Sequence, residues 1–96
     1  MKIRILPEAS RDIELGGDFY ESRQGGLGEY FISSTSSDIE SLRIFGGIHQ
    51  KHHGLFRMLS KRFPFAINYE IQDNAIKIYA VLDCRQDPSK ISARLV

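Results

Sequence analysis

Apolar and polar residues alternate most regularly between positions 65 and 83, and this alternation predicts a β-hairpin. Asp73 and Asn74 tolerate the positive φ angles of a tight turn, so we place the turn there. The resulting register pairs Ile71 with Ile76, Glu70 with Lys77, Tyr69 with Ile78, Asn68 with Tyr79, Ile67 with Ala80, Ala66 with Val81 and Phe65 with Leu82. In this register Ala66, and not a cation, lies in the middle of the exposed sheet surface.

The remaining elements follow from the same patterns. We expect a strand over Lys2–Leu6, a helix from Pro7 to about Arg23, a weaker second helix that ends near Phe45, and a strand over Leu55–Ser60. Gly16-Gly17 predicts a kink or two shorter helices, and the serine-rich stretch SSTSSD has a flexible loop as its alternative. A short turn or helix follows Pro88. The prediction is an α+β fold of order β-α-α-β-β-β, in which two N-terminal helices pack on one face of a mainly antiparallel twisted sheet and the other face stays partly open.

The composition is that of one ordinary globular domain over residues 1–96, with 42% hydrophobic and 26% charged residues. No apolar run is long enough to span a bilayer, and the start MKIRILPEAS has too short an apolar run for a signal peptide. Cys84 is the single cysteine, which excludes an internal disulfide bond. We therefore expect a cytoplasmic protein that does not associate with membranes.

The net charge is only +1, but the charges are unevenly distributed. Positions 41–69 contain no acidic residue, whereas they contain five lysines and arginines and three histidines. Such asymmetry is typical of a surface that meets an acidic partner, and a lopsided but solvated surface is the alternative. A dedicated nucleic-acid-binding domain is usually far more basic overall.

Three segments in this order, PEASRDIELGGDFYES, RFPFAINYEI and IYAVLDCRQDPSKISARL, resemble the RelE/ParE toxin superfamily of bacterial toxin–antitoxin systems. Members of this family are often described as plasmid stabilisation proteins. The resemblance implies a RelE/ParE-like fold and a growth-inhibiting toxin. It also implies a cognate antitoxin, encoded by an adjacent gene, whose tail wraps the toxin in a hetero-oligomer. RelE-like members cleave mRNA on the ribosome with basic residues on the open sheet face, whereas ParE-like members poison DNA gyrase.

The sequence favours the ParE-like activity within this resemblance. RelE-like enzymes place an arginine where this chain has Ala66, and no tyrosine follows Tyr79 to match the C-terminal tyrosine of some ribonuclease members. Alanine supplies neither charge nor proton to an RNA-cleaving site. We therefore expect a toxin that binds a protein target, with DNA gyrase as the candidate. The alternatives are a ribosome-dependent mRNA endoribonuclease and an inactive copy of such a toxin.

Five residues are candidates for a surface that binds the target or the antitoxin: Arg57, Arg62, Tyr79, Asp83 and Arg85. The three arginines are also the weak candidates for catalysis if the chain is a ribonuclease, and an ion pair of Arg85 with Asp83 or Asp87 is the purely structural alternative. The histidines His49, His52 and His53 lack the ligand set of a zinc site, so we predict neither a metal nor a cofactor. Cys84 has no sequence partner that would activate it as a nucleophile.

Overall fold

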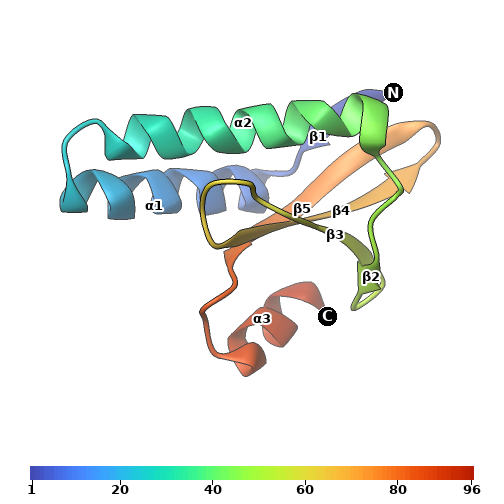
Figure 1. Ribbon diagram of the computed structural model, residues 1–96. Coiled ribbons are helices and arrows are strands. Elements are labelled where there is room, and N and C mark those ends of the chain that lie inside the picture. The colour runs from blue at the N-terminus through green and yellow to red at the C-terminus, as the bar shows by residue number, and fades with distance from the viewer.

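The computed structural model describes residues 1–96 as one mixed sheet between two helical layers. The elements are β1 Lys2–Ile5, α1 Pro7–Arg23, α2 Leu27–Phe45, β2 Lys51–His52, β3 Leu55–Leu59, β4 Phe65–Gln72, β5 Ala75–Asp83 and α3 Pro88–Leu95. The strand order is β1-β5-β4-β3-β2, and only β1 and β5 run parallel. Figure 1 shows the α1–α2 hairpin on one side of the sheet and α3 on the opposite side. The predicted α+β fold is confirmed, with β2 as an added strand and a full helix after Pro88.

The α1–α2 hairpin is built around glycines that allow close approach. Helix α1 runs through Gly16-Gly17 without interruption, so the predicted division into two helices is wrong. A Cβ added at Gly16 would lie 2.6 Å from Cε2 of Phe31 on α2, and one at Gly28 would lie 2.4 Å from the carbonyl oxygen of Gly17. The serine-rich stretch is helical, and three of its residues, Ser34, Thr35 and Asp38, are buried. The glycines are therefore contact points between the helices and not breaks in them.

The β4–β5 hairpin follows the predicted register only near its turn. Asp73 and Asn74 have φ angles of 52° and 59°, and the pairs Ile71–Ile76, Glu70–Lys77 and Tyr69–Ile78 are all present. Beyond Tyr69 the register shifts, so that β5 has one extra residue, Tyr79, at a β-bulge.

The bulge overturns the remaining predicted pairs because one extra residue reverses which side chains share a face. Asn68 pairs with Ala80, Ile67 with Val81, Ala66 with Leu82 and Phe65 with Asp83. Val81 therefore joins Ile67 on the face toward α1 and α2, while Leu82 joins Ala66 on the other face. Asp83 moves to the register position of Phe65, on the helix side, and not to the open face as predicted.

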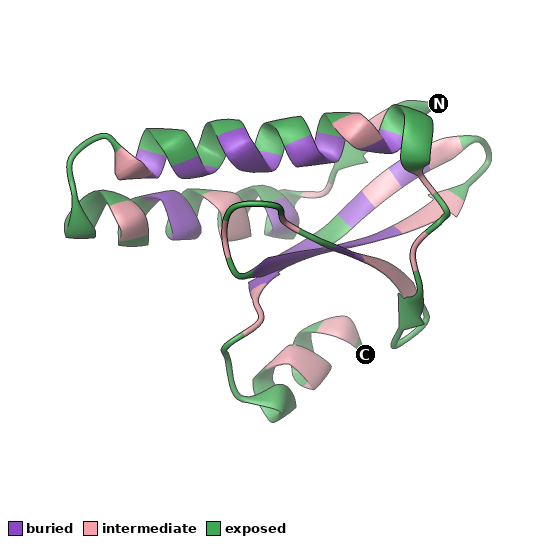
Figure 2. Ribbon diagram, in the orientation of Figure 1, coloured by how far each residue is buried: buried purple, intermediate pink, exposed green.

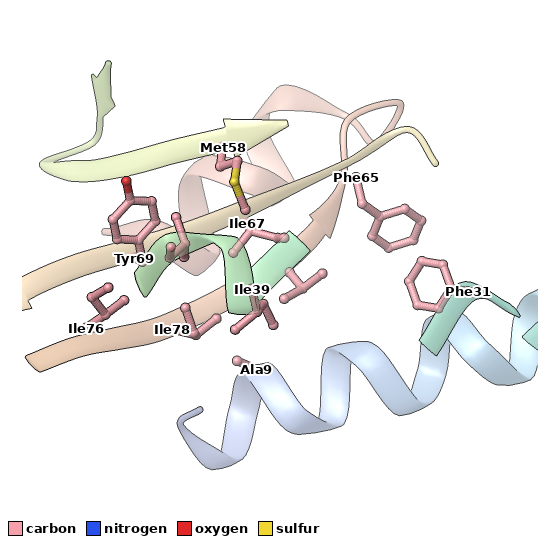
Figure 3. Close-up of a cluster of buried hydrophobic side chains, with 11 residues drawn as sticks. Ala9, Phe31, Ile39, Met58, Phe65, Ile67, Tyr69, Ile76 and Ile78 are labelled. Carbon is pink, nitrogen blue, oxygen red and sulfur yellow. The ribbon is translucent and has the colours of Figure 1, made fainter. Parts of the chain in front are cut away.

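The core lies between the sheet and the α1–α2 hairpin. Figure 3 shows Ile67 of β4 and Ile78 of β5 beside Ile39 of α2 and on the side of Ala9 of α1, and Tyr69 of β4 belongs to the same cluster. All five side chains are at most 3% exposed. Figure 2 shows the buried positions concentrated on the facing sides of these layers. Because a single core contacts both layers, the helices and the sheet depend on one another for stability.

Helix α3 closes the centre of the face that we predicted to be open. It packs on β5 opposite the other two helices (Figure 1), with Ile91 and Leu95 half-buried. On this face Ala66 is 4% exposed and Asn68 is 1% exposed. The expectation that Ala66 faces solvent is therefore wrong. The C-terminal segment, which we predicted only as a short turn or helix, covers the sheet.

A carboxylate with only 9% of its side chain exposed, that of Asp12, ties α3 to the rest of the fold. Arg94 donates from both terminal nitrogens to Asp12 of α1, at 2.8 and 2.9 Å. Asp12 Oδ2 also accepts the backbone N–H of Val81 at 3.0 Å, on the part of β5 that extends past the paired residues of β1. One side chain therefore joins α1, the outer edge of β5 and α3.

Candidate functional site

Arg57 lies in the middle of β3, opposite Asn68 of β4. Its terminal nitrogen donates to Sγ of Cys84 at 3.5 Å, a long contact to a weak acceptor. Arg57 also lines a hollow of about 260 Å³ with residues of the β2–β3 turn and α3: His52, His53, Pro88, Ile91 and Leu95. No carboxylate lines this hollow, and Arg57 makes no ion pair at this border between α3 and the sheet.

Asp83 and Arg85 form a bidentate ion pair at the end of β5. Arg85 donates from Nε and a terminal nitrogen at 3.0 and 2.8 Å, and its backbone N–H adds a third bond to Asp83 at 2.8 Å. The side-chain hydrogen bond from Arg85 lowers the pKa of Asp83, and Asp83 in turn raises the pKa of Arg85. The structural alternative for Arg85 is therefore the one observed. This pair neutralises the positive charge that Arg85 would bring to the predicted binding surface.

Arg62 lies in the loop between β3 and β4 and makes no ion pair. That loop is joined to the end of β5 by a hydrogen bond from the backbone N–H of Cys84 to the carbonyl of Pro64, at 2.7 Å. The chain segments that carry Arg62 and Arg85 therefore meet at one end of the sheet, with Arg57 linked to them through Cys84.

Tyr79 lies apart from this end, at the bulge. Its hydroxyl donates to Oε1 of Glu70 at 3.1 Å, and this hydrogen bond raises the pKa of Tyr79. The five predicted residues thus form no single constellation. Four are connected around the β5 terminus, and the fifth belongs to a separate polar cross-strand pair.

The histidines do not converge. The Tyr69 hydroxyl accepts the backbone N–H of Gly47 at 2.9 Å and contacts Nδ1 of His49 at 2.5 Å. Burial lowers the pKa of His49. His52 and His53 lie in the β2–β3 turn, and no group of three or more His, Cys, Asp or Glu side chains is arranged to hold a metal ion.

Sequence reasoning missed an apolar surface beside β3. Ile44, Phe45 and Ile48 at the end of α2 are at least half exposed, and so is Leu59 of β3. Phe45 precedes Gly46-Gly47 and Ile48 follows them, so the signal in the sequence was an apolar residue on each side of the glycines that end the helix.

Sequence reasoning also missed that Asn68 is buried. Its Nδ2 donates to the carbonyls of Ala66 and Ala80, while its Oδ1 has no partner.

The structure is similar to a chain of a solved structure described as "Chromosomal ParDE TA system from P. aeruginosa". The similarity has a TM-score of 0.76 at 16% sequence identity and covers 84% of this chain and 92% of that chain. No protein-family model and no curated protein matches the sequence. None of the helices has the length and hydropathy needed to cross a membrane. The fold expected from the resemblance, a ParE-like α+β fold, is the fold of this chain.

Proposed function

We propose that this chain is the toxin of a type II toxin–antitoxin pair. It inhibits growth by binding a protein target, with DNA gyrase as the first candidate, and a cognate antitoxin neutralises it. The single observation that supports this most is the structural similarity to a chain of the ParDE system, over almost the full length of both chains. The segments quoted from the sequence point to the same family independently.

The closed sheet face supports protein binding over RNA cleavage. RNA cleavage through the 2′-hydroxyl needs a proton acceptor, a proton donor and cations around the phosphate in an accessible site. At the centre of this face lie Ala66 and Asn68, both buried, and α3 packs on the adjoining strand. Of the three candidate arginines, Arg85 is already bound to Asp83.

The surface we assign to the target is the end of the sheet where Arg62, Arg57 and the Asp83–Arg85 pair lie. Neither Arg57 nor Arg62 makes an ion pair there, and Arg62 also has no side-chain hydrogen bond, so Arg62 is free to bind a carboxylate of a target. A charge reversal, Arg62→Glu, should reduce growth inhibition. Lys90→Glu, an exposed change on α3 at a residue with no ion pair, is the matched control and should leave growth inhibition unchanged.

Induction in a bacterial host tests the proposal. The chain should arrest growth, co-expression of the small protein encoded next to it should relieve the arrest, and the purified chain should inhibit supercoiling by DNA gyrase. Arrest and relief without an effect on gyrase would retain the toxin and reject the gyrase target. New cleavage ends within translated mRNA would replace the proposal with the nuclease alternative, and no growth effect would indicate an inactive copy.

A further inference from the structure

A hollow between the C-terminal half of α2 and β3, the α2–β3 hollow, contains a carboxylate that has no ion-pair partner. The hollow has a volume of about 260 Å³, and Asp38 of α2 is part of its lining. Asp38 is only 6% exposed, yet none of the ion pairs of the chain includes it. Buried charges are normally paired, because an unpaired charge loses its hydration without compensation. Asp38 is therefore an exception among the buried residues.

The carboxylate of Asp38 uses only one of its two oxygens within the protein. Oδ2 accepts from the hydroxyl of Ser60 at 2.8 Å and from the backbone N–H of Lys61 at 3.4 Å. Oδ1 accepts no hydrogen bond from the protein, and it is not fully enclosed. Because Asp38 lines the α2–β3 hollow, a ligand in the hollow meets a negatively charged acceptor there.

Lys61 brings a positive charge to the same hollow. Its side chain is part of the lining and makes no ion pair. The bond from its backbone N–H to Asp38 places the two residues next to each other, although their side-chain charges do not pair. The α2–β3 hollow therefore presents one negative and one positive group, and neither neutralises the other.

The rest of the lining is mainly apolar. It includes Phe45, Ile48, Met58 and Leu59. Ile48 is 73% exposed, and Phe45 and Leu59 are at least half exposed, so an apolar group bound there would remove them from water. The volume is slightly below the roughly 300–1,000 Å³ of pockets for drug-sized ligands, which indicates a small ligand.

Simple ions fit the α2–β3 hollow poorly. Asp38 and His49 are its only carboxylate and imidazole groups, and a protein-bound zinc ion usually has three or four such ligands or thiolates. Asp38 repels a simple anion, and Lys61 repels a simple cation. A small molecule that carries both charges and an apolar group matches the whole lining.

We propose that the α2–β3 hollow binds a free α-amino acid with an aliphatic side chain. The ammonium of the amino acid donates to Oδ1 of Asp38, and its carboxylate accepts from the ammonium of Lys61. Its side chain covers Phe45 and Ile48. A residue inside a peptide chain has neither of these charges on its backbone, so the site selects the free amino acid. This inference goes beyond the proposed function and does not depend on it.

Titration of the purified full-length chain with L-leucine, followed by NMR of the backbone amides, tests the proposal. We expect the amide signals of Ile48 and Lys61 to shift and to reach saturation. L-leucinamide lacks the carboxylate, and N-acetyl-L-leucine lacks the ammonium. Each should bind at least about tenfold more weakly than L-leucine, the effect of losing one charged hydrogen bond.

Variants of the two charged residues assign the contacts. Asp38→Asn keeps an acceptor for the hydroxyl of Ser60 but removes the negative charge, and it should weaken leucine binding by at least about tenfold. Lys61→Gln, a change at an exposed residue, should have a similar effect. Lys90→Gln is the matched control, because Lys90 is an exposed lysine that makes no ion pair and does not line the hollow. If Asp38→Asn does not fold, Lys61→Gln and the two leucine derivatives still decide the outcome.

Each contrary result has its own meaning. A spectrum that leucine leaves unchanged up to its solubility limit would overturn the proposal. Equal binding of L-leucinamide, or unchanged binding by Lys61→Gln, would show that the hollow recognises only an ammonium, and the amino-acid assignment would then be wrong. Equal binding of N-acetyl-L-leucine would exclude the contact with Asp38. Growth arrest is measured separately, so a chain that arrests growth without binding leucine would refute this site and leave the proposed function intact.

Discussion

Gly16 lies on the face of α1 that meets α2, where an added Cβ would come within 2.6 Å of Cε2 and 2.7 Å of Cζ of Phe31. Phe31 is fully buried among other aromatic rings, including Tyr20 and Phe65, which lie 5.2 and 4.8 Å away between ring centroids. Helix propensity alone treats this glycine as a defect, because an alanine would favour the helix by about 1 kcal/mol. The packing around Phe31 gives the opposite expectation, because the ring has little room to move.

Gly16→Ala should lower the free energy of unfolding by about 1–3 kcal/mol, the usual cost of overpacking a core. Gly25→Ala is the control, since its nearest neighbour to an added Cβ is the Glu21 carboxylate at 3.9 Å. Urea unfolding of both variants measures the difference. A stabilised Gly16→Ala variant would show that α1 and α2 can separate without cost.

His49 predicts a pH dependence at the same scale. Burial lowers its pKa below the ordinary value of 6.5, so the unfolded chain takes up a proton before the folded chain does. The stability associated with His49 is therefore complete above about pH 6.5 and decreases as the pH falls below it. The ring contacts the Tyr69 hydroxyl and lines the same hollow as Asp38 and Lys61.

We expect the urea midpoint of the wild-type chain to fall from pH 7 toward pH 5 more than that of His49→Gln. His53→Gln, an exposed change in the β2–β3 turn, should follow the wild-type curve. Because wild type and His49→Gln share every other titrating group, the difference between their changes in urea midpoint reports the contribution of His49. Parallel curves for wild type and His49→Gln would contradict the assignment.

At the scale of elements, the β4–β5 hairpin shows how much of a strand register the alternation of apolar and polar residues can predict. Asp73-Asn74 and the alternating residues beside it predicted three pairs that the structure contains. The bulge at Tyr79 has no local signal, because Ala80, Val81 and Leu82 are all compatible with either face. Their placement depends on two contacts that are remote in sequence. Asp12 bonds the N–H of Val81, and α3 packs against β5 on the face of Leu82.

The Asp12–Arg94 pair should control the opening of α3. No α3 residue is fully buried, so this ion pair is a large part of what holds the helix on the sheet. Arg94→Met should raise hydrogen exchange of the α3 amides about tenfold, as expected for the loss of a charged hydrogen-bonded pair. Exchange in β4 should stay unchanged. Lys90→Met, on the same helix at a residue with no ion pair, is the control, and equal effects of the two changes would rule out a specific role for Arg94.

At the scale of the whole molecule, local patterns predicted the layer of α1 and α2 but not that of α3. The first two helices show apolar spacing over many residues, whereas α3 has eight residues and a face defined only by Ile91 and Leu95. The surroundings of the candidate site residues could not be predicted for the same reason. Single positions such as Arg57 and Asp83 were placed by strand parity, and one bulge together with one covering helix changed their surroundings. The apolar surface beside β3, in contrast, depends on how the end of α2 lies against the sheet, which no periodicity shows.

A single core between the sheet and two helices predicts one cooperative unfolding transition. Ile67 is fully buried at the centre of β4 and faces both helices (Figure 3), so Ile67→Ala should cost about 2–5 kcal/mol. That is a large share of the roughly 5–15 kcal/mol that stabilises an ordinary domain.

Two spectroscopic probes test whether the helices and the core unfold together. Far-ultraviolet circular dichroism reports the helices. Tyrosine fluorescence reports the core in part through the buried Tyr69, one of the four tyrosines of a chain that has no tryptophan. Both signals should shift together to lower urea in Ile67→Ala and remain in place in Ile44→Ala, whose side chain is exposed. Transitions that separate between the two probes would mean that the helical layer and the sheet unfold independently, which their shared core does not allow.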